Sequence, residues 1–339
     1  MFRTAGFFKA CLGVFIGAFI ITPLLAGCGD RAAAQTQKMT PGYYDAEFEG
    51  TSAKGDAFLA CGTGGRLDRI FEDGSQENIP LSVDGNDLTD VLIDGELTLV
   101  CGAEGTVVFC RNGGEFQAAS GTGREHIMGL AQFKGSYYAC TYSGEILMSD
   151  DGESWKTSIQ LSEKPLIAIK ADSTYLMAIS EDTDIYKTKD GENWDHENYN
   201  KVYDGYAPQQ IFHNMENYLE TFTIIGSQAD NPEAPAVMSS SNGGEVWSVQ
   251  GSKEINGRPP EDYYPLTINA LSFFDDMLLA ACDKGRILTL TDCPSCDTIT
   301  EAADGDLHCI AVSKDKVLAA GSGFVFEVMD GAEFSVSDN

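Results

Sequence analysis

Residues 144–155 read GEILMSDDGESW and residues 184–194 read DIYKTKDGENW, and the likeness between these two stretches decides the fold. Each stretch runs from a short alternation of apolar and polar residues into an Asp-Gly turn and ends on tryptophan. An Asp-Gly pair between alternating apolar runs is a strong signal for a β-hairpin. Two copies of such a unit predict a chain that is built from repeated hairpins.

The turn recurs along the chain at a nearly fixed interval. Asp-Gly or Asn-Gly pairs, with Asp-Cys in the sixth copy, begin at residues 73, 112, 151, 190, 242, 292 and 330, so successive spacings are 39, 39, 39, 52, 50 and 38. In the third copy the predicted strands are Ile127–Phe133, Ser136–Tyr142, Glu145–Ser149 and Trp155–Gln160. Four short strands in one such repeat match a β-propeller blade. The sequence therefore predicts an all-β, seven-bladed β-propeller of four-stranded antiparallel blades.

The sequence leaves open how the ring closes. Residues 43–49 can supply the first strand of blade one, and Glu333–Val336 the last strand of blade seven. The ring then needs no strand exchanged between its first and last blades.

The first 27 residues are predicted to be a lipoprotein signal peptide. Arg3 and Lys9 form a positively charged region before an apolar run. Leu25-Ala26-Gly27-Cys28 is a small-residue cleavage site that ends in cysteine. This resembles the bacterial lipobox, which implies a diacylglycerol on the Cys28 thiol and attachment to the extracytoplasmic face of a bacterial membrane. The alternative is an uncleaved anchor helix, although the apolar run is short for a membrane span. Residues 28–41 are then a flexible tether, and residues 42–339 the propeller.

The turns also carry a family motif. SDDGESW at 149–155 and SSNGGEVW at 240–247 resemble the Asp-box, or bacterial neuraminidase repeat, and TKDGENW at 188–194 is a close variant. The motif is specific for the propeller fold and says little about function. Its residues are predicted to be structural, as acceptors for amides of their own turn (Asp151, Asp190, Asn242), as glycines at positive φ (Gly152, Gly191, Gly243) and as apolar plates at the outer edge of a blade (Trp155, Trp194, Trp247).

The longer repeats indicate a binding face. Their extra length falls at Lys201–Pro208, Ser227–Ala236 and Gly251–Tyr264, and antiparallel strand order puts all three on the face opposite the Asp-Gly turns. Insertions in repeat proteins gather on the working face. The candidate contact residues on this face are Arg66, Arg124, Tyr203, Tyr206, Arg258, Tyr263, Tyr264 and Arg286. The alternative is that they are solvated loop residues, with the arginines paired to carboxylates.

Charge and motif content exclude several functions. The chain has 52 acidic and 22 basic residues and a formal net charge of −30, and no two Lys or Arg residues are adjacent, which argues against nucleic acid as a partner. The four histidines, His126, His196, His213 and His308, lack the spacing of metal ligands, and no phosphate-binding loop or Gly-x-Ser-x-Gly motif occurs. We therefore predict no metal, no cofactor and no catalytic residue.

The cysteines fall into two groups. Cys61, Cys101, Cys140 and Cys282 share one repeat position, too far apart on neighbouring blades for disulfides, and are expected to be buried thiols. Cys293 and Cys296 stand where the sixth turn should be. A local disulfide is the first interpretation of this pair, a metal half-site the second and a redox centre the third.

The Asp-box motif makes a sialidase the first enzyme to consider. Sialidases with a similar fold bind the substrate carboxylate with three arginines. Their Arg-Ile-Pro motif is missing, since the candidates read Gly65-Arg66-Leu67 and Asp68-Arg69-Ile70. The repeats also resemble Asp-box propellers of the photosystem II stability and assembly factor type, which implies a protein partner. We predict a non-catalytic protein-binding or assembly module, with a glycan-binding module or a divergent sialidase-like glycoside hydrolase as alternatives.

Overall fold

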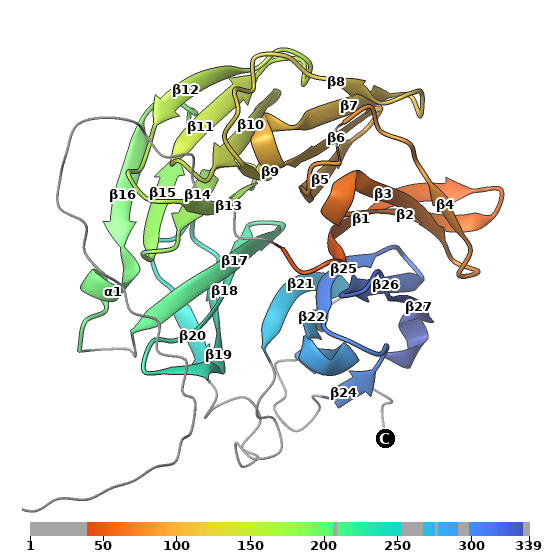
Figure 1. The fold of residues 1–339 in the computed structure, drawn as a ribbon. Helices are drawn as coiled ribbons and strands as arrows, with labels where there is room; N and C mark the ends of the chain where they lie inside the picture. The colour runs from red at the N-terminus through yellow and green to blue at the C-terminus, as the bar shows by residue number, and fades with distance from the viewer. Residues whose placement is uncertain are drawn as a thin grey trace, which may run out of the picture. The chain divides into compact units, whose positions relative to one another are not determined.

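The computed structural model describes residues 39–83, 85–205, 209–251, 267–274, 277–290 and 298–334. Within these residues the chain forms seven antiparallel sheets that stand side by side around a ring (Figure 1). The predicted signal peptide, Cys28 and most of the predicted tether lie outside the described residues.

Blades one to four each contain four strands in chain order. They are β1 (Tyr43–Ser52), β2 (Gly55–Gly62), β3 (Arg66–Phe71) and β4 (Gln76–Asn78); β5 (Leu88–Asp94), β6 (Leu97–Gly102), β7 (Val107–Arg111) and β8 (Gln117–Ala118); β9 (Ile127–Phe133), β10 (Ser136–Thr141), β11 (Glu145–Ser149) and β12 (Lys156–Gln160); and β13 (Leu166–Ala171), β14 (Leu176–Ser180), β15 (Asp184–Thr188) and β16 (Trp194–Asn198).

Blades five and six also have four strands, and blade seven has three within the described residues. They are β17 (Gln210–Tyr218), β18 (Thr221–Gln228), β19 (Asn231–Ser240) and β20 (Ser248–Gly251); β21 (Ile268–Phe274), β22 (Met277–Cys282), β23 (Arg286–Leu290) and β24 (Thr298–Glu301); and β25 (Leu307–Val312), β26 (Lys316–Gly321) and β27 (Phe326–Asp330). One short helix, α1 (Tyr199–Val202), links blades four and five, and 3-10 turns occupy Thr63–Gly65, Ala103–Gly105, Asp283–Gly285 and Gly331–Glu333.

The predicted strand pattern is confirmed, with one error at the end of blade seven. In blade three the first and third strands begin and end where the sequence predicts. The predicted strand Glu333–Val336 is wrong at its start, because Gly331–Glu333 form a 3-10 turn that the Asp330 side chain caps through the Ala332 amide. Residues 335–336 lie outside the described part of the chain.

The ring closes by packing between the first and last blades. The innermost strands contact one another in the order β1, β5, β9, β13, β17, β21 and β25, and β25 contacts β1 again. At the junction the Gly323 amide donates to the Pro41 carbonyl at 2.8 Å, and the rings of Tyr43 and Phe324 meet edge to face at 5.2 Å. Within the described residues β1 pairs with β2 of its own blade and no strand is exchanged between blades.

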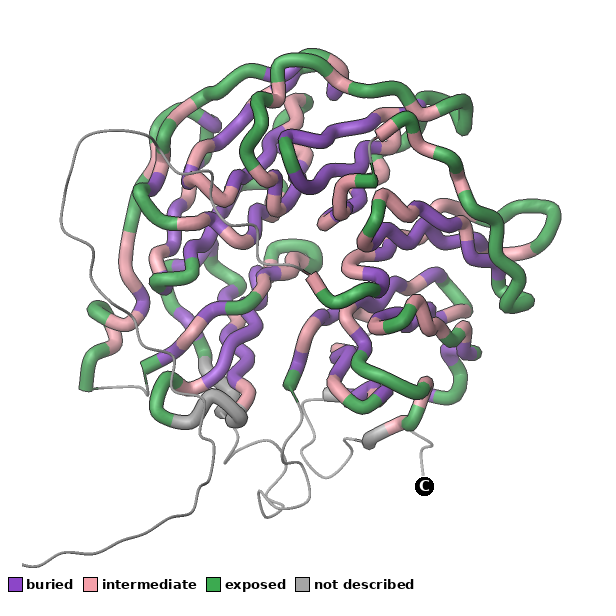
Figure 2. Tube along the Cα trace, viewed as in Figure 1, coloured by how far each residue is buried: buried purple, intermediate pink, exposed green. Residues whose placement is uncertain are grey.

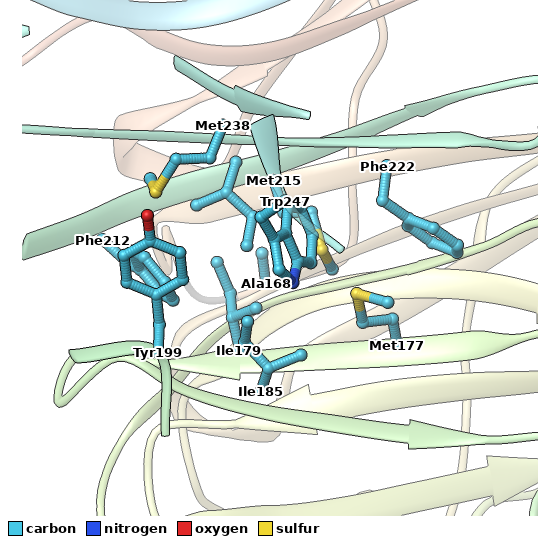
Figure 3. Close-up of a cluster of buried hydrophobic side chains, with 11 residues drawn as sticks. Ala168, Met177, Ile179, Ile185, Tyr199, Phe212, Met215, Phe222, Met238 and Trp247 are labelled. Carbon is cyan, nitrogen blue, oxygen red and sulfur yellow. The ribbon is translucent and has the colours of Figure 1, made fainter. Parts of the chain in front are cut away.

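Apolar side chains fill the spaces between neighbouring blades. The three inner strands of a blade are mostly buried, whereas β4 and β8 are exposed, as outer edges of a sheet usually are (Figure 2). Between blades four and five, Trp247 packs with Met177, Ile179 and Phe222 (Figure 3). Each blade therefore shares its core with its neighbours, and its stability depends on them.

Blade five is the longest blade. The extra residues predicted at Ser227–Ala236 extend β18 and β19, which pair as far as Gln228 and Asn231 and leave a two-residue turn. The insertion is therefore mostly β-hairpin, on the face where the sequence places it.

Candidate functional site

The strand order defines two faces of the propeller. We call the face with the links between blades and the second-to-third-strand hairpins the link face, and the opposite face the turn face. Because every sheet is antiparallel and runs in chain order, the Asp-Gly turns lie on the turn face. The described parts of the first two predicted insertions belong to the link face, and the third, Gly251–Tyr264, lies outside the described residues except for Gly251.

A cavity of about 430 Å³ opens on the link face between blades four and five. One wall is the β14–β15 hairpin, with Glu181, Asp182 and Asp184, and the other is the link that contains α1 and leads into β17. This link is the first of the three predicted insertions. The cavity thus lies where the sequence analysis expected a binding surface.

The cavity is polar and has charges of both signs. Asp182 lies 3.0 Å from the Lys164 ammonium, and Asp184 lies 3.0 Å from Nε2 of His196. Burial, followed by the neighbouring charge of Asp182, raises the pKa of Glu181. Carboxylates and side-chain amides line the same opening, so it can accept hydrogen-bond donors of a peptide or a cationic group.

The arginines of the link face stand in different surroundings. Arg66 lies 2.5 Å from the buried Asp68 carboxylate, and its guanidinium stands 4.5 Å from the centre of the Phe324 ring. Arg286 lies 3.7 Å from Glu301, and Arg124 is exposed between blades two and three. Arg66 and Arg286 are thus each paired with a carboxylate of their own blade.

Tyr203 serves the fold of the link. Its ring stacks on Tyr199 at 4.6 Å, and its hydroxyl accepts a hydrogen bond from the Trp247 amide at 3.2 Å. Tyr206, Arg258, Tyr263 and Tyr264 lie outside the described residues, and their role in binding stays a prediction.

The three turns that end on tryptophan, at 149–155, 188–194 and 240–247, form hydrogen-bonded loops; we call them the tryptophan turns. Asp151 accepts bonds from the Glu153 and Ser154 amides, both at 2.8 Å, and Asp190 is bonded in the same way at 2.9 and 2.8 Å. In the third turn the Asn242 side chain accepts from the Val246 amide at 3.1 Å. These bonds hold each turn in one conformation.

The tryptophan turns also join neighbouring blades. Gly191 has φ 78°, and a Cβ there would overlap the hydroxyl of Tyr138 on the preceding blade. A Cβ on Gly243 would overlap the Tyr175 ring of its own preceding blade. Trp155 and Trp247 are 5% exposed and lie in cores that two blades share. Both tryptophans directly precede the outer strand of their blade and pack against the neighbouring blade as well as their own.

The described cysteines are free thiols in the core. Cys61, Cys101, Cys140 and Cys282 are buried without a disulfide, as the sequence predicts, and burial raises the pKa of each thiol. Cys110 and Cys309 are also buried and free. Cys293 and Cys296 lie outside the described residues, so their pairing stays a prediction.

A charged cluster that the sequence analysis missed lies among the innermost strands. Two carboxylates bond amides of the next blade: Asp45 accepts from Val91 N at 2.8 Å, and Asp90 accepts from Leu130 N at 2.5 Å. The innermost strand of each blade has one edge that no neighbouring strand pairs with. The two carboxylates therefore accept hydrogen bonds from backbone amides that would otherwise have no partner in the sheet. The same two bonds join blades one, two and three.

The cluster contains one cation, Lys170, which lies 3.4 Å from Glu216. Burial opposes ionisation of Lys170, but Glu216, Asp90, Asp45 and Glu47 raise its pKa well above the ordinary value. Burial raises the pKa of Glu47 to about 7, and burial and then Asp90 raise the pKa of Asp45. The sequence contains one signal that could have revealed this cluster. In the first strand of some blades, ionisable residues occupy positions that are apolar in other blades.

Within the described residues, no group of three or more His, Cys, Asp or Glu side chains is arranged as a metal site. The histidines make separate contacts; for example, His213 bonds Ser227, and His308 lies 3.2 Å from the Tyr43 carbonyl and from Ser322. None of the helices in the described part of the chain has the length and apolar character needed to cross a membrane.

These features define the class of the protein, a seven-bladed β-propeller with a polar cavity on its link face. The sequence matches no protein-family profile and no curated protein. Among solved structures, the fold is similar to YCF48 bound to D1 peptide (TM-score 0.63, 15% identity, covering 86% of this chain and 94% of that one) and to YCF48 from Cyanidioschyzon merolae (0.61, 12%, 86% and 97%). It is also similar to the WD40 β-propeller domain of Doa1 (0.59, 9%, 86% and 93%). At these identities the similarity establishes the propeller fold.

Proposed function

We propose that the protein is a lipid-anchored, extracytoplasmic propeller that binds a protein partner without catalysis and belongs to the Asp-box group. The observation that carries the proposal is the polar cavity between blades four and five, since it opens beside the lengthened link on the face predicted for binding. Support for a protein partner comes from YCF48, a propeller of similar fold whose structure holds a peptide. The lipobox at residues 25–28 supports the anchor.

A crosslinking pull-down tests the binding face. The anchored protein is compared with Glu181→Lys and with a variant that lacks 251–264, and crosslinked peptides are mapped by mass spectrometry. We expect crosslinks on the link face and at least about tenfold less partner with either variant, because a reversed charge at a contact costs several kcal/mol. Glu192→Lys, the same exchange on the turn face, is the control. Unchanged capture by both variants would contradict the proposed face.

Two further measurements test the remaining parts of the proposal. Cys28→Ala should move the protein from the membrane fraction to the soluble fraction and abolish incorporation of a labelled fatty acid. A fluorogenic sialoside should not be hydrolysed. Hydrolysis that is lost in Arg66→Ala or Arg286→Ala would show that the protein is an enzyme.

A further inference from the structure

The exposed large apolar side chains of the described residues concentrate at blade five. They are Val202, Tyr218, Leu219 and Val246, which are 52%, 40%, 74% and 62% exposed. Val202 lies in the link into blade five, and the other three belong to that blade. Val202 lies on the link face, whereas Tyr218 and Leu219 are neighbours on the turn face. Single exposed apolar residues scattered over a surface need no explanation, but contiguous ones mark candidate interaction sites.

Leu219, the most exposed of them, stands at the tip of the β17–β18 hairpin on the turn face. Tyr218 pairs with Thr221, so Leu219 and Glu220 form a two-residue turn, and Leu219 has φ 53°. Left-handed backbone favours glycine, and the first turn residue of the corresponding hairpins in blades two and three is Gly95 and Lys134. The turn therefore does not require a leucine.

An aromatic pair lies beside this tip. Tyr218 stacks on Phe273 of β21, with ring centroids 4.4 Å apart and planes inclined by 14°. The Asn217 side chain donates to the Leu219 carbonyl at 3.1 Å and to the Thr221 carbonyl at 3.3 Å, which fixes the turn. We call Tyr218, Leu219 and Phe273 the apolar tip.

The charges around the apolar tip indicate which charge a bound segment should carry. Glu220 is exposed within the turn, and Glu216 lies two residues before Tyr218, on the same side of the strand. Glu216 is paired with Lys170 in the central cluster, so Glu220 is the exposed carboxylate of the tip. A second copy of this chain, with its own net charge of −30, would be repelled.

We propose that the apolar tip docks a basic segment of a protein partner in which apolar residues alternate with lysine or arginine. The apolar residues of the segment pack on Leu219 and on the Tyr218–Phe273 pair, and its cations approach Glu220. This surface lies on the turn face, so it is independent of the link-face site proposed above.

Fluorescence anisotropy with labelled peptides tests the proposal. The probes are a short peptide of alternating lysine and leucine and a matched peptide of alternating lysine and serine, at about 0.15 M salt, where weak surface attraction is screened. We expect the lysine–leucine peptide to bind at least about tenfold more tightly, because leucine adds the burial of apolar area. Equal binding of the two peptides would overturn the proposal.

Leu219→Gly is the decisive variant, because glycine is favoured at positive φ and the fold should be retained. We expect about tenfold weaker binding of the lysine–leucine peptide with an undiminished Tm, while Val246→Ala, a matched exposed apolar site, binds as the wild type does. Unchanged affinity in Leu219→Gly, or an equal loss in Val246→Ala, would overturn the proposal. A concentration-dependent dimer that Leu219→Gly abolishes would assign the tip to a second copy and also overturn it.

Discussion

Carboxylates at the centre of the ring and carboxylates in the tryptophan turns stand in opposite environments. Burial raises the pKa of Asp45 and Glu47 among the inner strands. In the turns, hydrogen bonds from the Ser154 and Glu153 amides lower the pKa of Asp151. The central carboxylates lose hydration and accept few hydrogen bonds in return, which raises their pKa. The turn carboxylates stay hydrated and also accept hydrogen bonds from backbone amides, which lowers their pKa.

The difference shows how an acidic propeller distributes its charge. Carboxylates on the outside are stabilised as anions, and they can be numerous because each stays hydrated. Those at the centre bond the free edges of inner strands, and they remain there because Lys170 compensates part of their charge. The centre should therefore respond strongly to mutation and to neutral pH, and the turns weakly and only in acid.

Removal of the central cation should have the largest effect. Lys170→Met leaves Glu216 and its neighbours without a counter-charge, so we expect the free energy of unfolding in urea to fall by about 3–5 kcal/mol at pH 7, and by less at pH 5. Lys164→Met, which breaks the exposed pair with Asp182, should change it by about 1 kcal/mol or less. Equal effects of the two variants would show that the central cluster behaves as ordinary surface.

The pH dependence of stability tests the raised pKa of Glu47. A raised pKa in the folded state means a contribution that is fully present below the unfolded pKa of 4.5 and is lost as the pH rises through about 7. At about 1.4 kcal/mol per pKa unit, we expect a loss of up to about 3 kcal/mol between pH 4 and 8. Glu47→Gln should flatten urea-unfolding profiles across this range, whereas the exposed Glu72→Gln should not. A profile that stays steep in Glu47→Gln would locate the titration elsewhere.

Substitution of one glycine measures how much the contact between a tryptophan turn and the preceding blade contributes to stability. Gly191→Ala introduces a Cβ at φ 78° that overlaps Tyr138, so we expect a loss of about 2–3 kcal/mol in thermal or urea unfolding. Gly74→Ala has nearly the same φ, 77°, with no atom within 4 Å of the added Cβ, and should cost about 1–2 kcal/mol. If the two variants lose equal stability, the contact between blades contributes nothing.

The smallest effect is expected for a single turn carboxylate. Asp151→Ala removes the acceptor of two amide bonds and should cost about 1 kcal/mol at pH 7. Because the folded pKa is lowered, this contribution is present above the unfolded pKa of 3.8 and is lost as the pH falls through the folded value. The difference between wild type and variant should therefore shrink in strong acid, with Glu192→Ala as the neutral control. A difference that persists at pH 2 would point to packing as its cause.

The repeat pattern predicted most of the fold and little of the site. Strand alternation and turns are local signals, so β9 and β11 begin and end where predicted. The end of blade seven differs because the Asp330 side chain favours a 3-10 turn there. The proposed binding face followed from strand order and loop length. The partners of Arg66 and Tyr203 did not, since Asp68, Phe324 and Tyr199 meet them only in the folded chain.

By itself the sequence determined the number of blades, their strand pattern and the face on which the long links gather, because hairpins and repeats are encoded by neighbouring residues. Only the tertiary structure decided which charges meet at the centre of the ring. Asp45, Asp90, Lys170 and Glu216 come from four different blades, and closure of the ring brings them within reach of one another. Closure also stacks Tyr218, the neighbour of the exposed Leu219, on Phe273 of the next blade, a contact that no local pattern contains.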